Sequence, residues 1–376
     1  MTPQPSLRVL ALGMGWFPEQ SGGLNRMVYH LAQALPAAGV DLHTLVAGGV
    51  AEAGVSGFAP LDAPLAQRLR GARAVAAARP RPDVVASHFA LYAAPALGPL
   101  RGVPHVVHFH GPWAAEGAAE GEPRWATATK RAVERHVYRR ADRFIVLSEA
   151  FRDVLVGRYG ADPACVRIVP GGVEAGRFDT GLSRADTRAR LGWDADRPTV
   201  LAVRRLARRM GLEDLIDATA ALRASVPDVL VQIAGTGAIE GELRARVAAR
   251  GLGGHVRLLG FVPDADLPLA YRAANISVVP TVALEGFGLI AAESLAAGTP
   301  ALVTPVGGLP EVVRGLSPAL VLPDTGPDAV ADGLARALTG RLALPDAAAC
   351  QAFARGRYDW SVIARGVADV YAEVAR

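Results

Sequence analysis

Short apolar runs alternate with longer amphipathic stretches along almost all of this 376-residue chain. The apolar runs lack strict apolar–polar alternation, which is typical of parallel strands covered by helices on both faces. The strands expected in the first half are Arg8–Leu12, Leu42–Val46, Val84–Ser87, Val106–Phe109, Phe144–Leu147 and Val166–Val169. Those expected in the second half are Val200–Val203, Leu230–Ala234, Val256–Leu259, Ile276–Val279, Ala301–Val303 and Leu320–Leu322. Two sets of this size are too many for one comfortable open sheet, so the pattern predicts two doubly wound α/β domains.

The amphipathic stretches predict helices between these strands and one last helix beyond the second set. They are Leu24–Ala38, Pro123–Arg140, Glu213–Ala224, Glu240–Ala249, Leu289–Ala297, Asp328–Leu338 and Trp360–Val374. We place the domain boundary in the Gly- and Pro-bearing stretch Pro170–Pro198. Open parallel sheets bind ligands at the carboxyl ends of their strands. Two such domains facing each other would form one deep cleft, so the loops that follow the strands are where chemistry is expected.

The composition limits which binding partners and which cellular compartment we expect for the protein. The net charge of +4 permits an anionic partner but is too small to indicate nucleic acid. Lys130 is the one lysine and lies outside any Gly-rich setting, which excludes a P-loop. The two cysteines, Cys165 and Cys350, exclude a disulfide scaffold and fit a reducing compartment. The polar start, Met1–Ser6, and the short run Leu7–Leu12 resemble neither a signal peptide nor a membrane span, so we expect a cytoplasmic protein.

Two loops of the first domain carry candidate binding residues. The loop after the first strand lacks the third small residue of a dinucleotide fingerprint, which argues against a dehydrogenase. Its Gly22-Gly23 pair would let backbone N–H groups meet a phosphate, although a flexible turn explains the pair equally well. His110 ends the fourth strand and is expected to bind a substrate, whereas His108 is expected in the core. Because no obvious third ligand joins these two histidines, we predict no metal.

The strongest chemical signal lies after the strand Ile276–Val279. Glu285 stands in the following loop, eight positions before Glu293. Gly286 and Gly288 expose backbone N–H groups at a helix start, which forms a ready anion site. A carboxylate beside such a site suits the hydroxyl groups of a sugar, which donate hydrogen bonds to it. The structural alternatives are a helix-dipole partner for Glu285 and a solvated helix position for Glu293.

Three further loops of the second domain end at the same predicted sheet edge. Arg205 and Arg209 follow its first strand, where arginines could clamp a diphosphate or line a solvated basic loop. The turn Gly235-Thr236-Gly237 follows the next strand and admits close approach of a ligand. Phe261 and Val262 follow the third strand, where they could wall a base-binding slot or serve packing alone.

Together these residues resemble the retaining glycosyltransferases of family 4, which have the GT-B fold of two Rossmann-like domains. The Glu285…Glu293 stretch, with its Glu-Gly-Phe-Gly sequence, is the most specific part of the resemblance. The other matching segments are Gly22-Gly23, His110-Gly111-Pro112-Trp113, Pro170-Gly171-Gly172-Val173, the segment around Arg205, Ala297-Gly298-Thr299-Pro300, Val306-Gly307-Gly308-Leu309-Pro310-Glu311 and Tyr358-Asp359-Trp360. The resemblance implies an acceptor-binding domain of residues 1–172, completed by a helix at 358–376, and a donor-binding domain of residues 173–357.

The family pattern also implies a role for individual residues. Glu293 would hold the ribose of a nucleoside-diphosphate sugar, and Glu285 the hydroxyl groups of the donor sugar. Arg205 would bind the diphosphate, and His110 would contact the donor sugar near the reacting carbon. The expected donor-binding set is Gly22, Gly23, Arg205, Arg209, Gly235, Gly237, Phe261, Val262, Glu285, Gly286, Phe287, Gly288, Leu289 and Glu293. In this family, cationic side chains and helix N-termini neutralise the leaving diphosphate, so neither a metal nor another cofactor is expected.

One position departs from the family pattern. The family usually carries a lysine immediately before the glycine that stands here as Gly211, but this chain has Met210, which cannot bind phosphate. Our hypothesis is that Arg209 or Arg208 supplies the missing charge from a shifted position. The alternative is a site that works with a single clamping cation.

The resemblance predicts transfer of a hexosyl-type sugar from a UDP- or GDP-sugar to an acceptor hydroxyl, with retention and by front-face attack. The acceptor could be a small molecule, a glycan or a lipid. The basic stretch Arg124–Arg140 permits peripheral contact with the inner face of a membrane, although a solvated helix face explains it as well. The alternatives are a nucleotide-sugar epimerase or sugar phosphorylase on this scaffold, and a donor-binding protein without turnover. The sequence indicates no oligomeric state.

Overall fold

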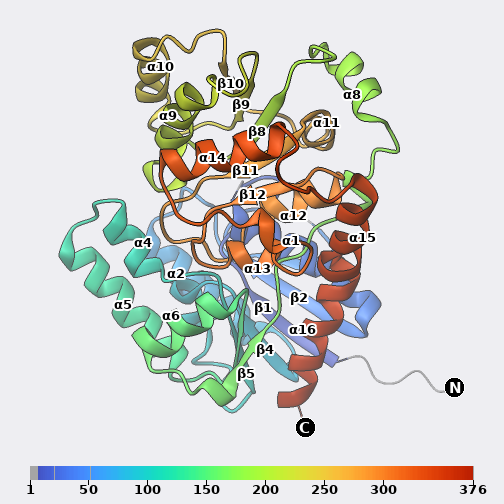
Figure 1. The fold of residues 1–376 in the computed structure, drawn as a ribbon. Helices are drawn as coiled ribbons and strands as arrows, with labels where there is room; N and C mark the ends of the chain where they lie inside the picture. The colour runs from blue at the N-terminus through green and yellow to red at the C-terminus, as the bar shows by residue number, and fades with distance from the viewer. Residues whose placement is uncertain (1–6, 21, 51, 376) are drawn as a thin grey trace, which may run out of the picture. The chain divides into compact units, whose positions relative to one another are not determined.

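The computed structural model describes residues 7–20, 22–50 and 52–375, so Met1–Ser6 lies outside it. The chain divides into two compact units (Figure 1). The first comprises Met1–Gly172 with Trp360–Arg376, and the second comprises Val173–Asp359. Each unit contains one parallel sheet, so both belong to the predicted doubly wound class. Within the described ranges, no helix has the length and apolar character needed to cross a membrane.

The N-terminal unit is built on seven parallel strands in the order β3-β2-β1-β4-β5-β6-β7. The strands are β1 (Leu7–Leu12), β2 (Val40–Val46), β3 (Val55–Gly57), β4 (Val84–Ser87), β5 (His105–Phe109), β6 (Arg143–Val146) and β7 (Val166–Ile168). The chain runs outward from β1 in one direction through β2 and then crosses to β4 on its other side. This reversal next to β1 is the topological switch point at which such sheets bind ligands.

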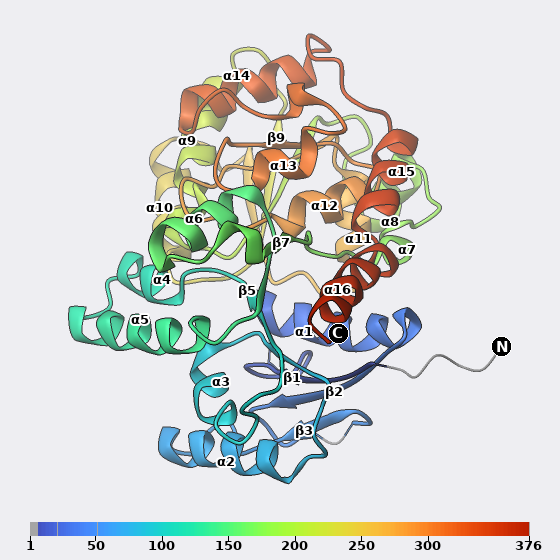
Figure 2. The same cartoon turned by 90° about the horizontal axis from the view of Figure 1, so that it is seen from below.

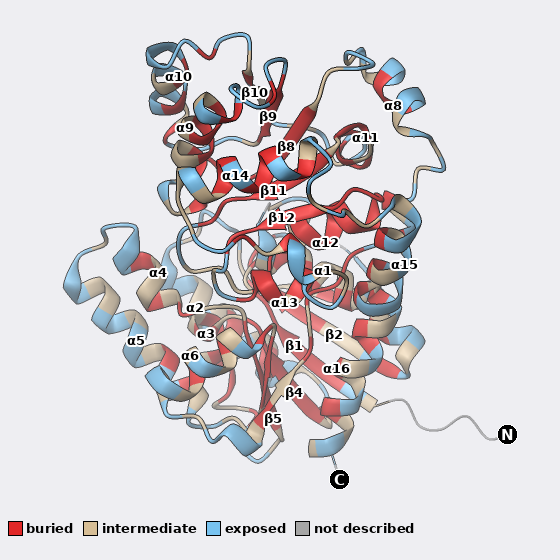
Figure 3. Cartoon of the chain, in the orientation of Figure 1, coloured by how far each residue is buried: buried red, intermediate tan, exposed pale blue. Residues whose placement is uncertain are grey.

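Helices cover both faces of this sheet, as Figure 2 shows for β1 and β2. They are α1 (Gly23–Ala34), η1 (Leu35–Ala38), α2 (Leu65–Ala78), α3 (Ala90–Ala96), α4 (Trp113–Ala119), α5 (Arg124–Tyr138), α6 (Glu149–Tyr159), η2 (Pro163–Cys165) and α16 (Trp360–Val374). The pleat of β1 sends Leu10 and Leu12 into a core shared with α2, α3, α5 and α6. Val9 and Ala11 enter a second core with α1 and α16. Figure 3 shows red, buried residues over most of the length of the labelled strands β1 and β4. Each fully buried Leu contributes about 1.5–3 kcal/mol.

The C-terminal unit has five parallel strands in the order β10-β9-β8-β11-β12. They are β8 (Thr199–Val203), β9 (Leu230–Ala234), β10 (Val256–Gly260), β11 (Ile276–Val279) and β12 (Ala301–Val303). The helices are α7 (Ala175–Phe178), α8 (Arg184–Leu191), η3 (Arg208–Met210), α9 (Leu212–Leu222), α10 (Glu240–Ala249), α11 (Leu267–Ala273), α12 (Leu289–Ala296), α13 (Leu309–Val313), η4 (Pro318–Leu320), α14 (Pro327–Leu338) and α15 (Ala347–Tyr358). The switch point lies at β8, between β9 and β11.

Two strand predictions differ from the structure. The strand expected at Leu320–Leu322 is wrong, because Pro318 starts a 3-10 turn there and Val321 makes only an isolated parallel bridge to Val303. The edge strand β3 was not predicted, because it is three residues long and ends in a glycine. The two sheets therefore have seven and five strands, not six each.

Candidate functional site

A buried ion pair joins two neighbouring loops at the switch point of the C-terminal sheet. Arg204 directly follows β8, and Glu285 lies in the loop after β11. Nη2 of Arg204 is 2.6 Å from Oε2 of Glu285, and the two side chains are only 7% and 16% exposed. The same nitrogen donates a hydrogen bond to Oγ1 of the buried Thr281. Because water screens this pair poorly, the guanidinium fixes the position of the Glu285 carboxylate.

The structure does not place Arg205, the predicted diphosphate ligand, against Glu285. Arg205 is exposed at the end of β8, whereas Arg204 is buried. Arg204 is thus the arginine of this pair that contacts Glu285. Our sequence reasoning missed Arg204. Its position directly after a predicted strand was a signal, but its partner depends on β8 lying next to β11, which the sequence pattern does not reveal.

The two arginines of η3, Arg208 and Arg209, differ in their partners. Nη1 of Arg209 donates to the carbonyl oxygen of Leu284 at 2.7 Å, so this side chain lies against the loop after β11. Arg208 is 69% exposed and pairs instead with Glu242 at 2.7 Å and with Glu213 at 3.6 Å. Met210 is buried. Of the two arginines that we expected to compensate for Met210, Arg209 is therefore the one whose position suits the role.

The backbone that carries Glu285 has an unusual shape. Leu284 has a φ of 55° and is the one non-glycine residue with positive φ among those the structure describes. The carbonyl oxygen of Glu285 accepts a hydrogen bond from the N–H of Gly308 at 3.0 Å. A Cβ on Gly307 would collide with that same oxygen. A positive φ at a non-glycine residue such as Leu284 costs about 1–3 kcal/mol and persists only where the surrounding structure fixes it. Such residues cluster at ligand-binding sites.

The start of α12 provides the predicted amide groups. Gly288 is the N-cap residue with a φ of 93°, and a Cβ there would collide with the side chain of Leu309. Gly286 and Leu289 on either side are partly exposed. Phe287 is buried, and its ring packs edge-to-face against Tyr358 at 5.4 Å between centroids. The Phe287 side chain therefore belongs to the core, and only its backbone amide remains a candidate for ligand binding.

Glu293 lies in α12 and is buried, which excludes the solvated position that we considered for it. Its Oε2 accepts a hydrogen bond from the hydroxyl of Tyr271 at 3.1 Å. A buried carboxylate held by a tyrosine hydroxyl is an acceptor of fixed position. Such a group suits recognition of a hydroxyl group on a ligand.

The glycine turn after β9 has a structural explanation. A Cβ on Gly235 would collide with the carbonyl oxygen of Arg204, and one on Gly237 with that of Leu206. Both glycines are thus required where this turn packs against the loop after β8. Their predicted contact with a ligand stays a prediction.

Phe261, which directly follows β10, is exposed to solvent. Its side chain is 74% exposed, and Val262 beside it is half-buried. An exposed aromatic ring at the carboxyl end of a strand can stack on a planar ligand. The predicted wall of a base-binding slot is therefore compatible with the structure.

The predicted glycine pair of the N-terminal unit lies at the start of α1. Gly22 is the N-cap residue with a φ of 138°, and both Gly22 and Gly23 are exposed. The preceding loop is organised by the buried Asn25, whose Oδ1 accepts from the N–H of Gly15 at 3.0 Å. This helix start therefore presents exposed backbone beside the switch point of its sheet.

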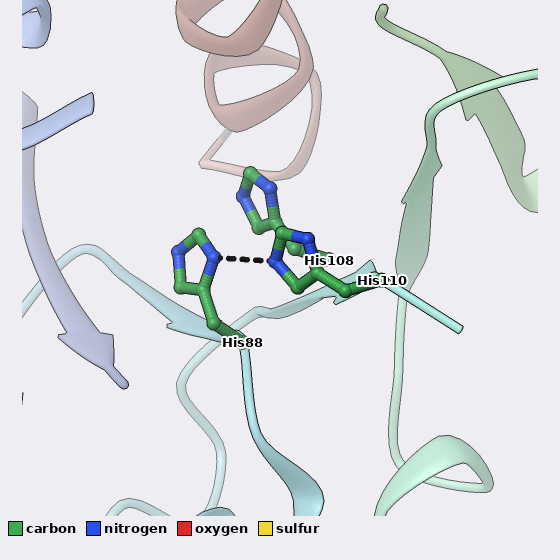
Figure 4. Close-up of side chains that lie close together, drawn as sticks. All are labelled: His88, His108 and His110. Atoms are coloured by element: carbon green, nitrogen blue, oxygen red, sulfur yellow. Dashed lines mark hydrogen bonds between the residues drawn. The ribbon is translucent and has the colours of Figure 1, made fainter. Parts of the chain in front are cut away.

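A group of histidines lies at the carboxyl ends of β4 and β5 (Figure 4). Nδ1 of His88 is 3.0 Å from Nε2 of His110, with which it shares a hydrogen bond. His108 is buried, as predicted, and its Nε2 is hydrogen-bonded to the hydroxyl of Tyr371 at 2.7 Å. Burial lowers the pKa of His110 to about 4 and pushes the pKa values of His88 and His108 well below their ordinary value. All three rings are therefore neutral near pH 7.

His88 is a second residue that the sequence reasoning missed. Its signal was available, because it directly follows the predicted strand Val84–Ser87. The prediction of no metal rests on the premise that no third ligand joins His108 and His110. That premise is wrong, because nitrogen atoms of His88, His108 and His110 all lie within 4.8 Å of one another.

Two doubly wound units with charged loops at the switch point define the GT-B class of glycosyltransferase folds. Two family models match the chain: residues 183–357 match the one described as glycosyl transferases group 1, and residues 21–177 match glycosyltransferase family 4. The chain belongs to this family, as its motifs indicated.

Relatives and solved structures agree with this assignment. The chain is 32% identical over 66% of its length to D-inositol 3-phosphate glycosyltransferase of Corynebacterium kroppenstedtii, 57% of which is covered. It is 29% identical over 98% of its length to glycogen synthase of Mycobacterium tuberculosis, 95% of which is covered. In contrast to its match with glycogen synthase, the chain spans only about half the length of several D-inositol 3-phosphate glycosyltransferases that it matches.

Two solved structures share the fold over nearly the whole chain. Sucrose-phosphate synthase of Thermosynechococcus elongatus has a TM-score of 0.77 at 23% identity and covers 98% of both chains. HepE of Anabaena, solved with UDP and glucose, has a TM-score of 0.78 at 21% identity and covers 98% of this chain and 100% of its own. Likeness at these identities establishes the fold.

Proposed function

We propose that this protein transfers a hexosyl residue from a UDP- or GDP-sugar to an acceptor hydroxyl, with retention of anomeric configuration. The observation that carries the proposal is the arrangement at the switch point of the C-terminal sheet. There, Arg204 holds Glu285 at 2.6 Å, Arg209 holds the adjacent carbonyl, and α12 begins one turn further on. The names of the relatives and the UDP and glucose in HepE support a nucleotide-sugar donor.

We assign the donor-binding roles within the C-terminal unit as follows. Arg205, Arg209 and the first amides of α12 bind the diphosphate, because guanidinium groups and helix N-termini both favour phosphate oxygens. Glu293 accepts hydrogen bonds from the ribose, and Glu285 from the hydroxyl groups of the sugar. Arg204 is a positioning residue, since it contacts Glu285 and thereby fixes where that carboxylate meets the sugar.

The reaction that suits this arrangement needs no protein nucleophile. The acceptor oxygen attacks the anomeric carbon as the bond from that carbon to the β-phosphate oxygen breaks, and the acceptor's proton passes to that phosphate. Arginines and backbone amides stabilise the negative charge that develops on the diphosphate, so we propose that transfer proceeds without a metal or another cofactor. We assign His110 to contact with the donor sugar.

The N-terminal unit is our candidate for binding the acceptor, which we place among small molecules, glycans and lipids.

We propose that the protein acts in the cytoplasm. The thiols of Cys165 and Cys350 are free, which suits a reducing compartment. Peripheral contact with the inner face of a membrane, through the basic helix α5, is part of the same proposal.

A transfer assay tests this proposal. The purified protein is incubated with UDP- and GDP-sugars and a panel of acceptors in the presence of a chelator. We expect acceptor-dependent release of the nucleoside diphosphate and a product whose anomeric configuration, read by NMR, matches the donor. Glu285→Gln should lower kcat/KM about 10- to 150-fold, the loss expected for a charge-assisted hydrogen bond of about 1.5–3 kcal/mol. Arg208→Ala is the matched control and should leave kcat/KM unchanged.

Three results would contradict the proposal. Conversion of the donor sugar without an acceptor would identify an epimerase. Dependence on inorganic phosphate would identify a phosphorylase. Tight donor binding without turnover, across the whole acceptor panel, would identify a binding protein.

A further inference from the structure

The three histidines at the carboxyl ends of β4 and β5 form a compact cluster of nitrogen ligands. His108 and His110 come from one strand and its end, and His88 comes from the end of the neighbouring strand (Figure 4). The His88 ring stacks on the His108 ring with centroids 4.1 Å apart, and on the His110 ring at 5.3 Å. In the part of the chain that the structure describes, this is the one group of three His, Cys, Asp or Glu side chains that could hold a metal ion.

The chemistry of this cluster suits a borderline divalent ion. Neutral imidazole nitrogens are good ligands for Zn²⁺, Cu²⁺ and Ni²⁺, whereas Mg²⁺ and Ca²⁺ prefer oxygen. Two ligands with zinc bonds of 2.0–2.1 Å lie about 3.4 Å apart at a tetrahedral angle. Nδ1 of His88 and Nε2 of His110 are already 3.0 Å apart, so they need little movement to share an ion.

Tyr371 supplies the support that such sites require. Its hydroxyl lies 2.7 Å from Nε2 of His108, and the tyrosine itself is buried in α16. A metal-bound histidine commonly directs its second nitrogen to a partner that fixes the orientation and tautomer of the ring. Coordination through Nδ1 of His108 would leave Nε2–H to donate to this hydroxyl.

We propose that His88, His108 and His110 bind one Zn²⁺ ion through three imidazole nitrogens, with a fourth position left for water or another small ligand. The shared proton between His88 and His110 moves to the outer nitrogen of its ring as the ion binds, so no proton needs to leave the cluster. As the ion binds, the His108 ring turns about its hydrogen bond to Tyr371, so that Nδ1 leaves the stack on His88 and faces the ion.

This site has a consequence for activity, which rests on the proposed function. His110 is our candidate for contact with the donor sugar, and a metal-bound His110 cannot make that contact. The ion therefore acts as an inhibitor of transfer, and a chelator should raise the activity of protein that carries zinc. This agrees with a transfer reaction that needs no metal of its own.

The test measures metal binding directly on the full-length chain, which separates it from the proposed function. Zn²⁺ is titrated by calorimetry, and Co²⁺ is used as a spectroscopic probe. We expect one equivalent of Zn²⁺ and a visible Co²⁺ spectrum of a four- or five-coordinate nitrogen site. Binding of several weak equivalents, or a Co²⁺ spectrum like that of the hydrated ion, would overturn the proposal.

Variants connect the bound ion to the cluster. His88→Asn keeps an amide where Nδ1 stands and should weaken Zn²⁺ binding by more than about 100-fold, because the loss of an outer partner alone costs about 10- to 100-fold. Tyr371→Phe preserves the buried ring and should weaken binding about 10- to 100-fold. His43→Gln is the control, since His43 is half-buried on β2 and bonded to Ser56 at 3.0 Å. The proposal is wrong if the folded His88→Asn and Tyr371→Phe proteins bind Zn²⁺ like the wild type, or if His43→Gln reduces binding as much as they do.

Zinc binding and glycosyl transfer can fail independently. One equivalent of Zn²⁺ bound by a protein that shows no transfer would support the site and contradict only the proposed function. Transfer that is fully insensitive to Zn²⁺ bound at one equivalent would contradict the inhibitory role.

Discussion

Replacing Arg204 with methionine should destabilise the C-terminal unit strongly. Methionine has a similar length but no charge, so Arg204→Met leaves the Glu285 carboxylate without the guanidinium that lies 2.6 Å away. It also removes the donor to Thr281, whose side chain is fully buried. The carboxylate is only 16% exposed, so water replaces the lost partner poorly.

The size of the effect follows from this burial. Breaking one side of a buried ion pair costs about 3–5 kcal/mol. Because Glu285 keeps some exposure, we expect a value near the lower end, about 3 kcal/mol. In a unit of this length, each kcal/mol lowers Tm by about 2–4 °C, which predicts a fall of about 6–12 °C. Arg208→Met is the matched control from the same loop. Its pair with Glu242 is largely exposed and should contribute no more than about 1 kcal/mol.

Denaturant unfolding and calorimetry of five proteins provide the assay. The wild type, Arg204→Met, Glu285→Gln and the double variant form a double-mutant cycle, and Arg208→Met is the control. Residues in direct contact show coupling energies of about 0.5–3 kcal/mol, and we expect the upper half of that range. The reasoning is refuted if Arg204→Met costs no more than Arg208→Met, or if the two single effects simply add.

Three other predictions follow from the same geometry. Gly288→Ala should lower stability by about 1–3 kcal/mol in chemical denaturation, because φ is 93° and the new Cβ meets Leu309. Arg209→Ala should weaken nucleoside-diphosphate binding in calorimetry, whereas Arg208→Ala should not; silence of both would refute the compensation for Met210. Burial lowers the pKa of His105 to about 4, so the stability that its neutral ring contributes is lost as pH falls from 6.5 towards 4. The stability difference between the wild type and His105→Asn, measured by unfolding across that range, should therefore shrink.

The sequence predicts most of the framework because buried parallel strands are continuous apolar runs. β4, β9, β11 and β12 begin and end where predicted, as do α10 and α16. The errors in strand prediction occur where a segment is apolar but does not pair in the sheet, or pairs without a recognisable apolar pattern. Val321 is flanked by leucines but follows a proline turn, which leaves it with a single bridge to Val303. β3 pairs with β2 over three residues, too few to produce a pattern.

The site is less predictable because it depends on which strands are neighbours. Glu285 stands out in the sequence through the glycines around it, but its partner Arg204 becomes visible only once β8 is known to lie beside β11. His88 and His110 likewise meet because β4 pairs with β5. Arg204 is buried and Arg205 is exposed in the segment that follows β8, a difference that the sequence pattern alone does not show.

Nucleoside-diphosphate binding is the most direct test of the central claim, that the C-terminal unit holds a nucleotide-sugar donor. The melting temperature of the folded protein is measured with UDP, GDP, ADP and TDP in the presence of a chelator. A ligand at one hundred times its Kd stabilises the native state by about 2.7 kcal/mol, which for a unit of this length raises Tm by about 5–10 °C. We predict such a shift with UDP or GDP, and its loss in Glu293→Gln but not in Glu242→Gln. Absence of any shift with all four nucleotides would contradict the account.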